Sequence, residues 1–436
     1  MQRLGRWRSH LSGRITPAGW LMLTGVVFTA LIGVDISSSM AYQGFALLAA
    51  VSLLAFAGTM RFQGRFSLQR RLPRYASAGE PFGYTITVRN ESGAVQRGLT
   101  LLEEVGDPVE SLGEALRPLR PARRAGSFKL VRSPVRRRLA HFTPIPLPDL
   151  ATAGEVEVTA RLWPQRRGPL RFMGARVSRT DPFGLLRTFV RVEWPQTVLV
   201  LPKRYKVPSL ALPGHEAYQV GGVAQAAAVG QSEEFVSLRH YRRGDPMRHI
   251  HWRSWARIGE PIVKEFEDEF FVRHGLVLDT FDDPDDPEPF EEAVSVAASF
   301  ACAIGTQESL LDLMFVGVKA FRFTAGRGLA QSDQLLEILA CARLTPEAEL
   351  STLSALVMEH LSSLTACVCV LLKWDPARQE LVRRIRQSGI PLRVLVVLPR
   401  GTPPPADLGP MADRPGAFRV LHPGSVEEEL ASLGGS

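Results

Sequence analysis

The segment CVCVLLKWDPARQELVRRIRQSGIPLRVLVVL, residues 367–398, is the part of the sequence that most clearly indicates a fold. Residues 367–372 and 392–398 are apolar runs of strand length, and a helical pattern over residues 377–387 lies between them. Strand, helix and strand at this spacing are typical of a sheet of parallel strands that is covered by helices. The segment therefore predicts an α/β domain.

The same alternation of strand and helix patterns continues on both sides of this segment. Apolar runs predict strands at residues 275–279, 313–318, 321–323 and 418–421, and helical patterns cover residues 290–307, 334–343, 353–364 and 426–433. Together they predict a mostly parallel, doubly wound sheet. Ligands of such sheets bind beyond the carboxyl ends of the strands, where Asp279 and Asp375 follow two of the predicted strands.

Two apolar stretches near the N-terminus predict membrane spans. Residues 18–34 and 41–60 each have the roughly 17–25 residues that a helix needs to cross a bilayer core. The charged residue between Arg14 and Arg61 is Asp35 alone. Arginines precede the first stretch and follow the second, and the positive-inside rule therefore puts both ends, and all residues after the second span, in the cytoplasm.

The middle of the chain shows the period-2 alternation of short β-strands. Residues 82–90, 156–162 and 197–201 alternate apolar and polar side chains, and Gly and Pro separate them, which is typical of a β-sandwich-like domain. Residues 117–138 carry nine basic residues and no acid, but Phe128 is the one aromatic among them, which argues against a nucleic-acid partner. A solvated loop and a basic face against anionic headgroups both remain open.

Composition places the 436-residue chain among ordinary globular proteins. Apolar residues make up 45% and the net charge is +8, so a disordered chain is excluded. The four cysteines have no C-x-x-C spacing and lie in apolar runs, and we expect buried, reduced thiols. No P-loop, G-x-S-x-G or H-E-x-x-H motif occurs, so we expect a protein that is not an enzyme.

The densest motif of the chain spans residues 230–269. Asp245 suits a helix N-cap and Pro246 a first helical position, which predicts a helix to about residue 257. His240, His249 and His251 with Asp245 could instead hold a metal, although a two-residue spacing does not place His249 and His251 on one helix face. The structural alternative is a charge network under Trp252, made by Arg239, Asp245, Arg248 and Arg257.

This segment resembles the bacterial family called domain of unknown function 58. The resemblance rests on Gly230, Glu234, Phe235, Leu238, Arg239, Tyr241, Gly244, Asp245, Arg248, Ile250, Trp252, Ala256 and Arg257. Residues 181–185, DPFGL, following residues 166–169, RRGP, also resemble an upstream segment of that family. The resemblance implies a bacterial inner-membrane protein that works beside a cytosolic MoxR-type AAA+ ATPase.

The C-terminal part resembles a von Willebrand factor A domain, whose metal-ion-dependent adhesion site begins D-x-S-x-S. The matching window here is Asp279-Thr-Phe-Asp-Asp283, in which Phe281 and Asp283 replace the serines. Asp375 in Lys373-Trp-Asp375 occupies the place of a later ligand, and Thr345 or Ser351 that of the loop threonine. Because Phe281 offers no oxygen, we expect a degenerate site that binds Mg²⁺ or another divalent cation weakly or not at all.

Acidic residues surround this predicted site in the sequence. Between residues 265 and 292 twelve acids stand against one base, Arg273. The run can be a solvated loop, or a negative rim of the sheet that faces a basic partner.

These observations predict five parts along the chain. They are a basic cytoplasmic tail (1–14), a transmembrane helical hairpin (15–60), a β-rich domain (61–215), the signature segment (216–270) and a von Willebrand factor A-like α/β domain (271–436). The favoured function is a membrane-anchored adaptor in protein maturation or envelope-related assembly. A metal-dependent hydrolase that uses the histidine cluster, and a structural envelope protein, are the alternatives.

Overall fold

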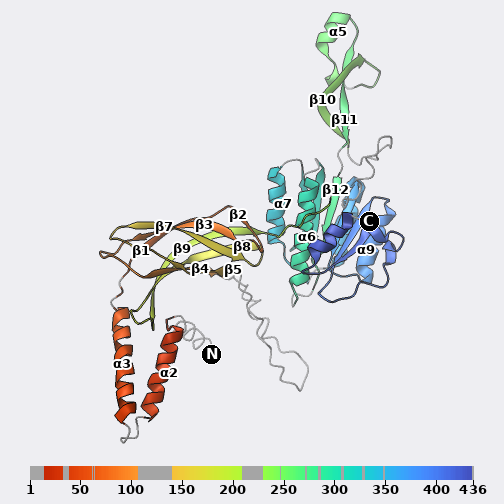
Figure 1. Ribbon diagram of the computed structural model, residues 1–436. Coiled ribbons are helices and arrows are strands. Elements are labelled where there is room, and N and C mark those ends of the chain that lie inside the picture. Colours follow the sequence, from red (N-terminus) through yellow and green to blue (C-terminus); the bar gives the residue numbers. More distant parts are fainter. Residues whose placement is uncertain are drawn as a thin grey trace. The chain divides into compact units, whose positions relative to one another are not determined.

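The computed structural model describes residues 14–32, 39–60, 62, 64–106, 140–208, 229–245, 247–270, 273–282, 286–305, 309–326, 329–346 and 349–434. The predicted basic run 117–138 and Asp283 lie outside these residues. The contacts within the chain divide it into two units, Met1–Leu201 and Pro202–Ser436. Each unit is multi-layered and has its own core, so the chain is a multi-domain protein (Figure 1).

Two apolar helices begin the first unit. They are α2 (Pro17–Ile32) and α3 (Ser39–Met60). Most of their large apolar side chains are exposed, with Leu21 77% and Leu53 69% exposed, although Ala55 is buried. Among the described residues, one segment, Tyr42–Met60, is long and apolar enough to cross a membrane, and α2 is shorter. An apolar helix that the protein leaves uncovered suits a lipid environment, so α3 is a candidate membrane span.

Two β-sheets form the rest of the first unit. The first has the strand order β1 (Phe66–Arg71), β3 (Phe82–Asn90), β7 (Glu155–Pro164) and β5 (Ala140–Phe142). The second has the order β2 (Tyr75–Ser77), β9 (Arg187–Leu201), β8 (Gly168–Thr180), β4 (Leu99–Gly106) and β6 (Ile145–Pro146). Neighbouring strands are antiparallel, except that β2 runs parallel to β9.

The two sheets of the first unit bury one common core. Alternate side chains of each sheet point into it, such as Ile86 and Val88 of β3 and Phe172 and Val177 of β8, all at most 1% exposed. This alternation is the pattern that the sequence predicts, and β3 has the predicted bounds. The first unit is thus a β-rich domain with two packed layers.

An ion pair is enclosed within this β-rich domain. Arg70 donates from Nε and Nη2 to the two carboxylate oxygens of Glu103, at 2.9 and 2.8 Å, and both side chains are at most 1% exposed. The guanidinium also donates to the carbonyl of Trp194 and lies 4.8 Å from the ring centroid of Phe172. Burial raises the pKa of Glu103, and the bonds from Arg70 oppose this rise. A buried pair of this kind persists because each charge satisfies the other.

A six-stranded mixed sheet organises the second unit. Its order is β14 (Ala320–Ala325), β13 (Leu310–Val316), β12 (Arg273–Leu278), β15 (Ala366–Leu371), β16 (Leu392–Val397) and β17 (Phe418–Leu421). Strands β13, β12, β15, β16 and β17 are parallel to one another, and the edge strand β14 is antiparallel to β13. Strands β12 and β15 are buried on both faces, as their continuous apolar runs require.

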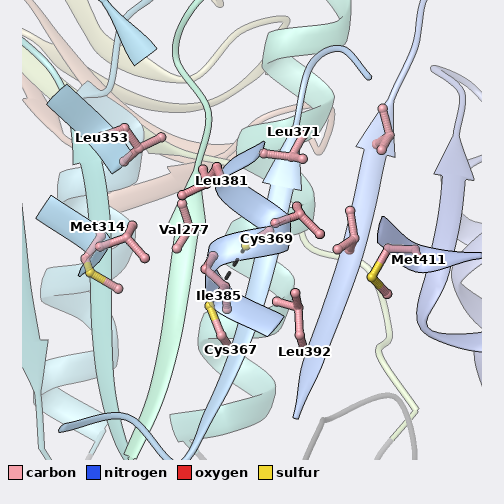
Figure 2. Packing of buried hydrophobic residues seen from close by; sticks show 14 of the residues in the cluster. Val277, Met314, Leu353, Cys367, Cys369, Leu371, Leu381, Ile385, Leu392 and Met411 are labelled. Atoms are coloured by element: carbon pink, nitrogen blue, oxygen red, sulfur yellow. Dashed lines mark hydrogen bonds between the residues drawn. The ribbon is translucent and has the colours of Figure 1, made fainter. Parts of the chain in front are cut away.

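Helices cover both faces of this sheet (Figure 1). They are α6 (Glu288–Gly305), α7 (Leu329–Cys341), α8 (Leu350–His360), α9 (Pro376–Gln387) and α10 (Val426–Ala431), with short 3₁₀ turns at Leu361–Ser363, Gly409–Met411, Pro415–Ala417 and Ser432–Gly434. Helix α9 packs Leu381 and Ile385 onto Val277 and Cys369 of the sheet (Figure 2). The predicted strand, helix and strand of residues 367–398 are therefore confirmed.

The four cysteines do not all have the predicted environment. Cys367 and Cys369 are fully buried on one face of β15, with their sulfurs 3.9 Å apart (Figure 2). Cys302 is half-buried, and Cys341 is exposed at the end of α7. The expectation of a buried thiol is wrong for Cys341, because the helix turns that residue away from the sheet and the apolar run alone does not reveal the face.

The signature segment forms a separate β-hairpin in the second unit. Strands β10 (Val229–His240) and β11 (Ile262–Phe270) pair antiparallel, and between them lie the 3₁₀ turn Met247–His249 and the short helix α5 (Trp252–Ile258). The predicted helix from Asp245 to residue 257 is wrong in its first half. Buried Ile250 pairs with Val263, and His251 N donates to the carbonyl of Ile262, so the chain is extended there.

Candidate functional site

The candidate site lies where the central strands of the second unit end. Asp279 directly follows β12 and is fully buried. One carboxylate oxygen, Oδ1, accepts the backbone N–H of Phe281 at 2.9 Å, and the other, Oδ2, accepts that of Leu372 at 3.0 Å. The bond from Leu372 joins the ends of β12 and β15, which are neighbours in the sheet. A carboxylate buried in this way requires a positive partner.

Arg378 of α9 is that positive partner. Its Nε donates to Asp279 Oδ2 at 2.6 Å, its Nη1 donates to Asp375 Oδ2, and its Nη2 donates to the carbonyl of Phe281 at 2.6 Å. The side chain is only 5% exposed. Burial lowers the pKa of Arg378, but Asp279 and Asp375 raise it by more, so the guanidinium is held in its charged form. One side chain thus neutralises two carboxylates from different elements.

Asp375 orients this guanidinium and also begins the helix. It is the N-cap of α9, where its Oδ1 accepts the backbone N–H of Arg378 at 2.9 Å and Pro376 takes the first helical position. The Asp-Pro start therefore places Arg378 in the first turn, directed back toward the strand ends.

The predicted metal ligands have different environments. Asp279 and Asp375 converge on Arg378, whereas Asp283 lies outside the described residues. Thr345 donates to Thr280 Oγ1 at 3.2 Å beside the end of β12, but Ser351 donates to Glu349. Among the residues that the structure describes, no three His, Cys, Asp or Glu side chains are grouped as a metal would require.

A pocket of about 500 Å³ opens next to these carboxylates. Trp374 forms one wall, where its ring packs edge-on against Phe418 at 4.8 Å and its Nε1 donates to the carbonyl of Asp407. Asp282, Asp286 and Asp375 are among the lining residues, and Lys373 makes an ion pair with Asp282 at 2.7 Å. The site is therefore a hollow with an aromatic wall and an acidic rim, at the ligand-binding edge of the sheet.

Sequence reasoning did not identify Arg378, although the sequence carries a signal for it. A cation in the first turn of a helix is unfavourable because that end of the helix dipole is positive. An arginine three residues after an Asp-Pro N-cap, as at Arg378, therefore needs nearby carboxylates. The decisive carboxylate, Asp279, is 99 residues away in the chain.

The signature hairpin is built around a second arginine–aspartate pair. Arg239 donates from Nη1 and Nη2 to the two oxygens of Asp245, at 2.7 and 2.9 Å, and Arg242 N donates to Asp245 at 2.7 Å. These bonds lower the pKa of Asp245 to about 2. Gly244 has φ +114°, a conformation that side chains disfavour, which explains a glycine in this turn. Part of the predicted network, the pair Arg239–Asp245, is thus present.

Three further signature residues, Tyr241, Trp252 and Arg257, lie in or next to the connection between β10 and β11. Tyr241 N donates to the carbonyl of Pro261, and Arg257 lies in the last turn of α5, where a cation is favourable. The ring of Trp252 stacks on that of Trp255 at 5.3 Å and is 61% exposed. The side chain of Glu234 lies outside those that the structure describes.

The three histidines of the signature have separate partners. His240 Nδ1 lies 3.2 Å from a carboxylate oxygen of Glu260. His249 Nε2 accepts from Arg248, and His251 Nδ1 shares a hydrogen bond with Ser254. Within the described part of the hairpin, these side chains form no group that could hold a metal with Asp245.

Comparison with known proteins supports the family resemblance over part of the chain. Residues 237–371 match the family model described as "Protein of unknown function DUF58". A Bacillus subtilis (strain 168) protein described as "Uncharacterized protein YeaD" is 28% identical over 178 residues, or 40% of this chain. The matched part is 43% of that relative, so the chain spans less than half of its length.

Solved structures show distant likeness to part of the chain. The CARDB domain of the PF1109 protein from Pyrococcus furiosus is 12% identical over 32% of this chain and 89% of that domain, with a TM-score of 0.19. Proximal thread matrix protein 1 from the mussel byssus is 10% identical over 38% of this chain and 47% of its own, with a TM-score of 0.29.

Proposed function

We propose that the protein is a membrane-anchored adaptor without enzymatic activity, which binds a cytosolic MoxR-type AAA+ ATPase in protein maturation or envelope-related assembly. In this proposal α2 and α3 form a two-span hairpin in the bacterial inner membrane. The second unit is a von Willebrand factor A-like domain that binds the partner at the strand-end pocket. The choice of partner class rests on the family resemblance of the signature segment, and residues 237–371 match that family, which is described as of unknown function.

One observation carries the proposal, namely the position of Arg378 between Asp279 and Asp375. The guanidinium supplies from inside the protein the positive charge that a divalent cation would bring to two carboxylates. The neighbouring pocket then offers a partner fixed charges and an aromatic wall, which suits protein binding by shape and charge. Chelators are expected to leave such binding unchanged.

The acidic rim provides a direct test. Asp286 is exposed and lines the pocket, so Asp286→Lys is expected to lower the association rate constant for the ATPase by about three- to tenfold at low salt, with little change in dissociation. The difference is expected to shrink as salt shortens the Debye length. Surface-immobilised full chain in detergent, titrated with the ATPase at two salt concentrations, measures both rates.

The matched control is Glu359→Lys, the same charge change at an exposed residue of α8 that does not line the pocket. Equal effects of the two substitutions would mean that net charge alone governs association. A complex that dissociates on addition of a chelator would contradict binding without a metal.

The membrane topology leads to a separate expected result. A reporter enzyme that is active only outside the cytoplasm should be silent when fused after Ser436, because arginines flank both apolar helices. The same reporter inserted within residues 37–39 should be active. Activity after Ser436 would place the second unit outside the cytoplasm and exclude a cytosolic ATPase as its partner.

A further inference from the structure

The turn between β8 and β9 is closed by its own backbone and by one aspartate. This turn, residues 181–186, has the sequence DPFGLL. Asp181 accepts the N–H of Phe183 through Oδ2, at 2.9 Å, and that of Leu186 through Oδ1, at 2.6 Å. Gly184 has φ +73° and donates to the carbonyl of Asp181. The turn is therefore held in one conformation.

The first turn of α2 is bonded directly to this closed turn. Thr16 donates from its backbone N–H to the carbonyl of Leu185 at 2.9 Å and from its hydroxyl to the carbonyl of Gly184 at 2.6 Å. The same hydroxyl accepts the N–H of Gly19 and so caps the helix. A Cβ on Gly19 would lie 2.3 Å from the carbonyl oxygen of Leu185, so only glycine permits this approach.

The same turn also reaches the end of α3. A Cβ on Gly58 would lie 3.5 Å from Cδ of Pro182, which is ordinary contact distance, and Gly58 is in the last turn of α3. The turn thus touches the start of one apolar helix and the end of the other. If both helices span the bilayer, the turn lies at the level of one membrane surface.

The side chains that this turn presents suit a membrane surface. Phe183 is 50% exposed, although its backbone N–H is bonded to Asp181. Exposed arginines flank the turn on three segments, namely Arg14 before α2, and Arg179 and Arg187 on either side of the turn. Trp20, 47% exposed, lies one helical turn after Thr16, and aromatic side chains favour the headgroup layer.

The segments around the turn carry more basic than acidic residues. In residues 14–19, 58–65 and 179–187 the one acid is Asp181, and its oxygens accept backbone N–H groups. An arginine near an anionic membrane surface is attracted to it by the negative surface potential. The arginines therefore favour acidic phospholipid headgroups as the ligand.

We propose that the turn of residues 181–186 is a lipid-binding site, in which Phe183 inserts into the interfacial layer and Arg14, Arg179 and Arg187 bind anionic phospholipid headgroups. This inference rests on the proposed membrane hairpin. In this proposal the DPFGL segment holds the β-rich domain against the bilayer, in addition to its contacts with the two helices.

A spin label reports the depth of the turn in the membrane. Phe183→Cys is labelled in the full chain carrying Cys302→Ala and Cys341→Ser, because the two remaining cysteines are fully buried. The chain is reconstituted into vesicles of phosphatidylcholine with phosphatidylglycerol. We expect the ratio of collision rates with oxygen and with a water-soluble nickel chelate to be severalfold higher at position 183 than at Val95→Cys, an equally exposed site of the same unit.

A label at Leu47→Cys, in the middle of α3, separates this inference from the proposed anchor. A deep label at position 47 with a water-like label at position 183 would overturn the lipid-binding site and leave the anchor intact. A water-like label at position 47 would overturn the anchor, and the inference with it.

The arginines are tested by lipid composition. In pure phosphatidylcholine, or in the double variant Arg14→Gln with Arg187→Gln, the label at position 183 should move toward water relative to the anionic vesicles. Both arginine side chains are exposed, and the backbone bond between Arg187 N and the carbonyl of Arg14 does not depend on them. Equal depth under all three conditions would overturn headgroup binding.

Discussion

Replacement of Arg378 by alanine is expected to lower the free energy of unfolding of the second unit by about 3–5 kcal/mol. The reason is that Asp279, fully buried, loses the charge that neutralises it, while its bonds to backbone N–H groups hold it in place. Hydrogen exchange of the β12 and β15 amides in the detergent-solubilised full chain measures this change, because these strands lie at the centre of the sheet.

Arg383→Ala is the matched control for this substitution. Arg383 lies on the same helix, is half exposed, and pairs with Glu380 at the surface, so its loss should change stability by less than about 1 kcal/mol. The double variant Arg378→Ala with Asp279→Asn should recover part of the loss, since it removes the unpaired charge. A loss below about 1 kcal/mol for Arg378→Ala alone would contradict the assigned charge balance.

The single variant Arg378→Ala also tests whether the guanidinium takes the place of a bound cation. Without Arg378, the carboxylates of Asp279 and Asp375 are both unpaired and offer the oxygen ligands that Mg²⁺ and Mn²⁺ prefer. Either ion is therefore expected to raise the melting temperature of Arg378→Ala more than that of the wild type. Equal shifts would mean that the two carboxylates do not form a latent cation site.

Replacement of Arg70 by alanine is expected to have an effect of similar size on the first unit. It leaves the fully buried carboxylate of Glu103 without its two bonds from the guanidinium, which should lower the free energy of unfolding by about 3–5 kcal/mol. Hydrogen exchange of the β4 and β8 amides measures this loss of stability. The double variant Arg70→Met with Glu103→Leu should be much closer to the wild type, because paired burial of charge adds little net stability over apolar packing.

The loss in Arg70→Ala should also depend on pH. Burial raises the pKa of Glu103, and without Arg70 the main opposition to this rise is lost, while the smaller opposition from Tyr84 remains. The folded state then binds a proton that the unfolded state has already released, so the variant should lose stability as pH increases from about 5 to 8. A loss that is constant over this range would show that Glu103 becomes hydrated in the variant.

Much of the fold could be predicted from the sequence, because the responsible interactions are local. The apolar runs and helical periodicity of residues 367–398 depend only on neighbours in the chain, and strands β15 and β16 and helix α9 occur where the pattern predicts them. The length and apolar character of α3 are likewise local properties. The family match of residues 237–371 could also be predicted from the sequence, because the signature motif is a run of neighbouring residues.

The tertiary structure decided which charged and polar groups meet. Arg378 bonds to Asp279 across 99 residues, and Thr16 bonds to Leu185 across 169, so no local pattern links either pair. The first half of the helix predicted from Asp245 is absent for the same reason, because Ile250 gains a buried pairing with Val263 that outweighs a local N-cap. Most of the secondary structure follows from near neighbours, whereas the partner of a buried charge or of an exposed turn depends on how distant segments pack.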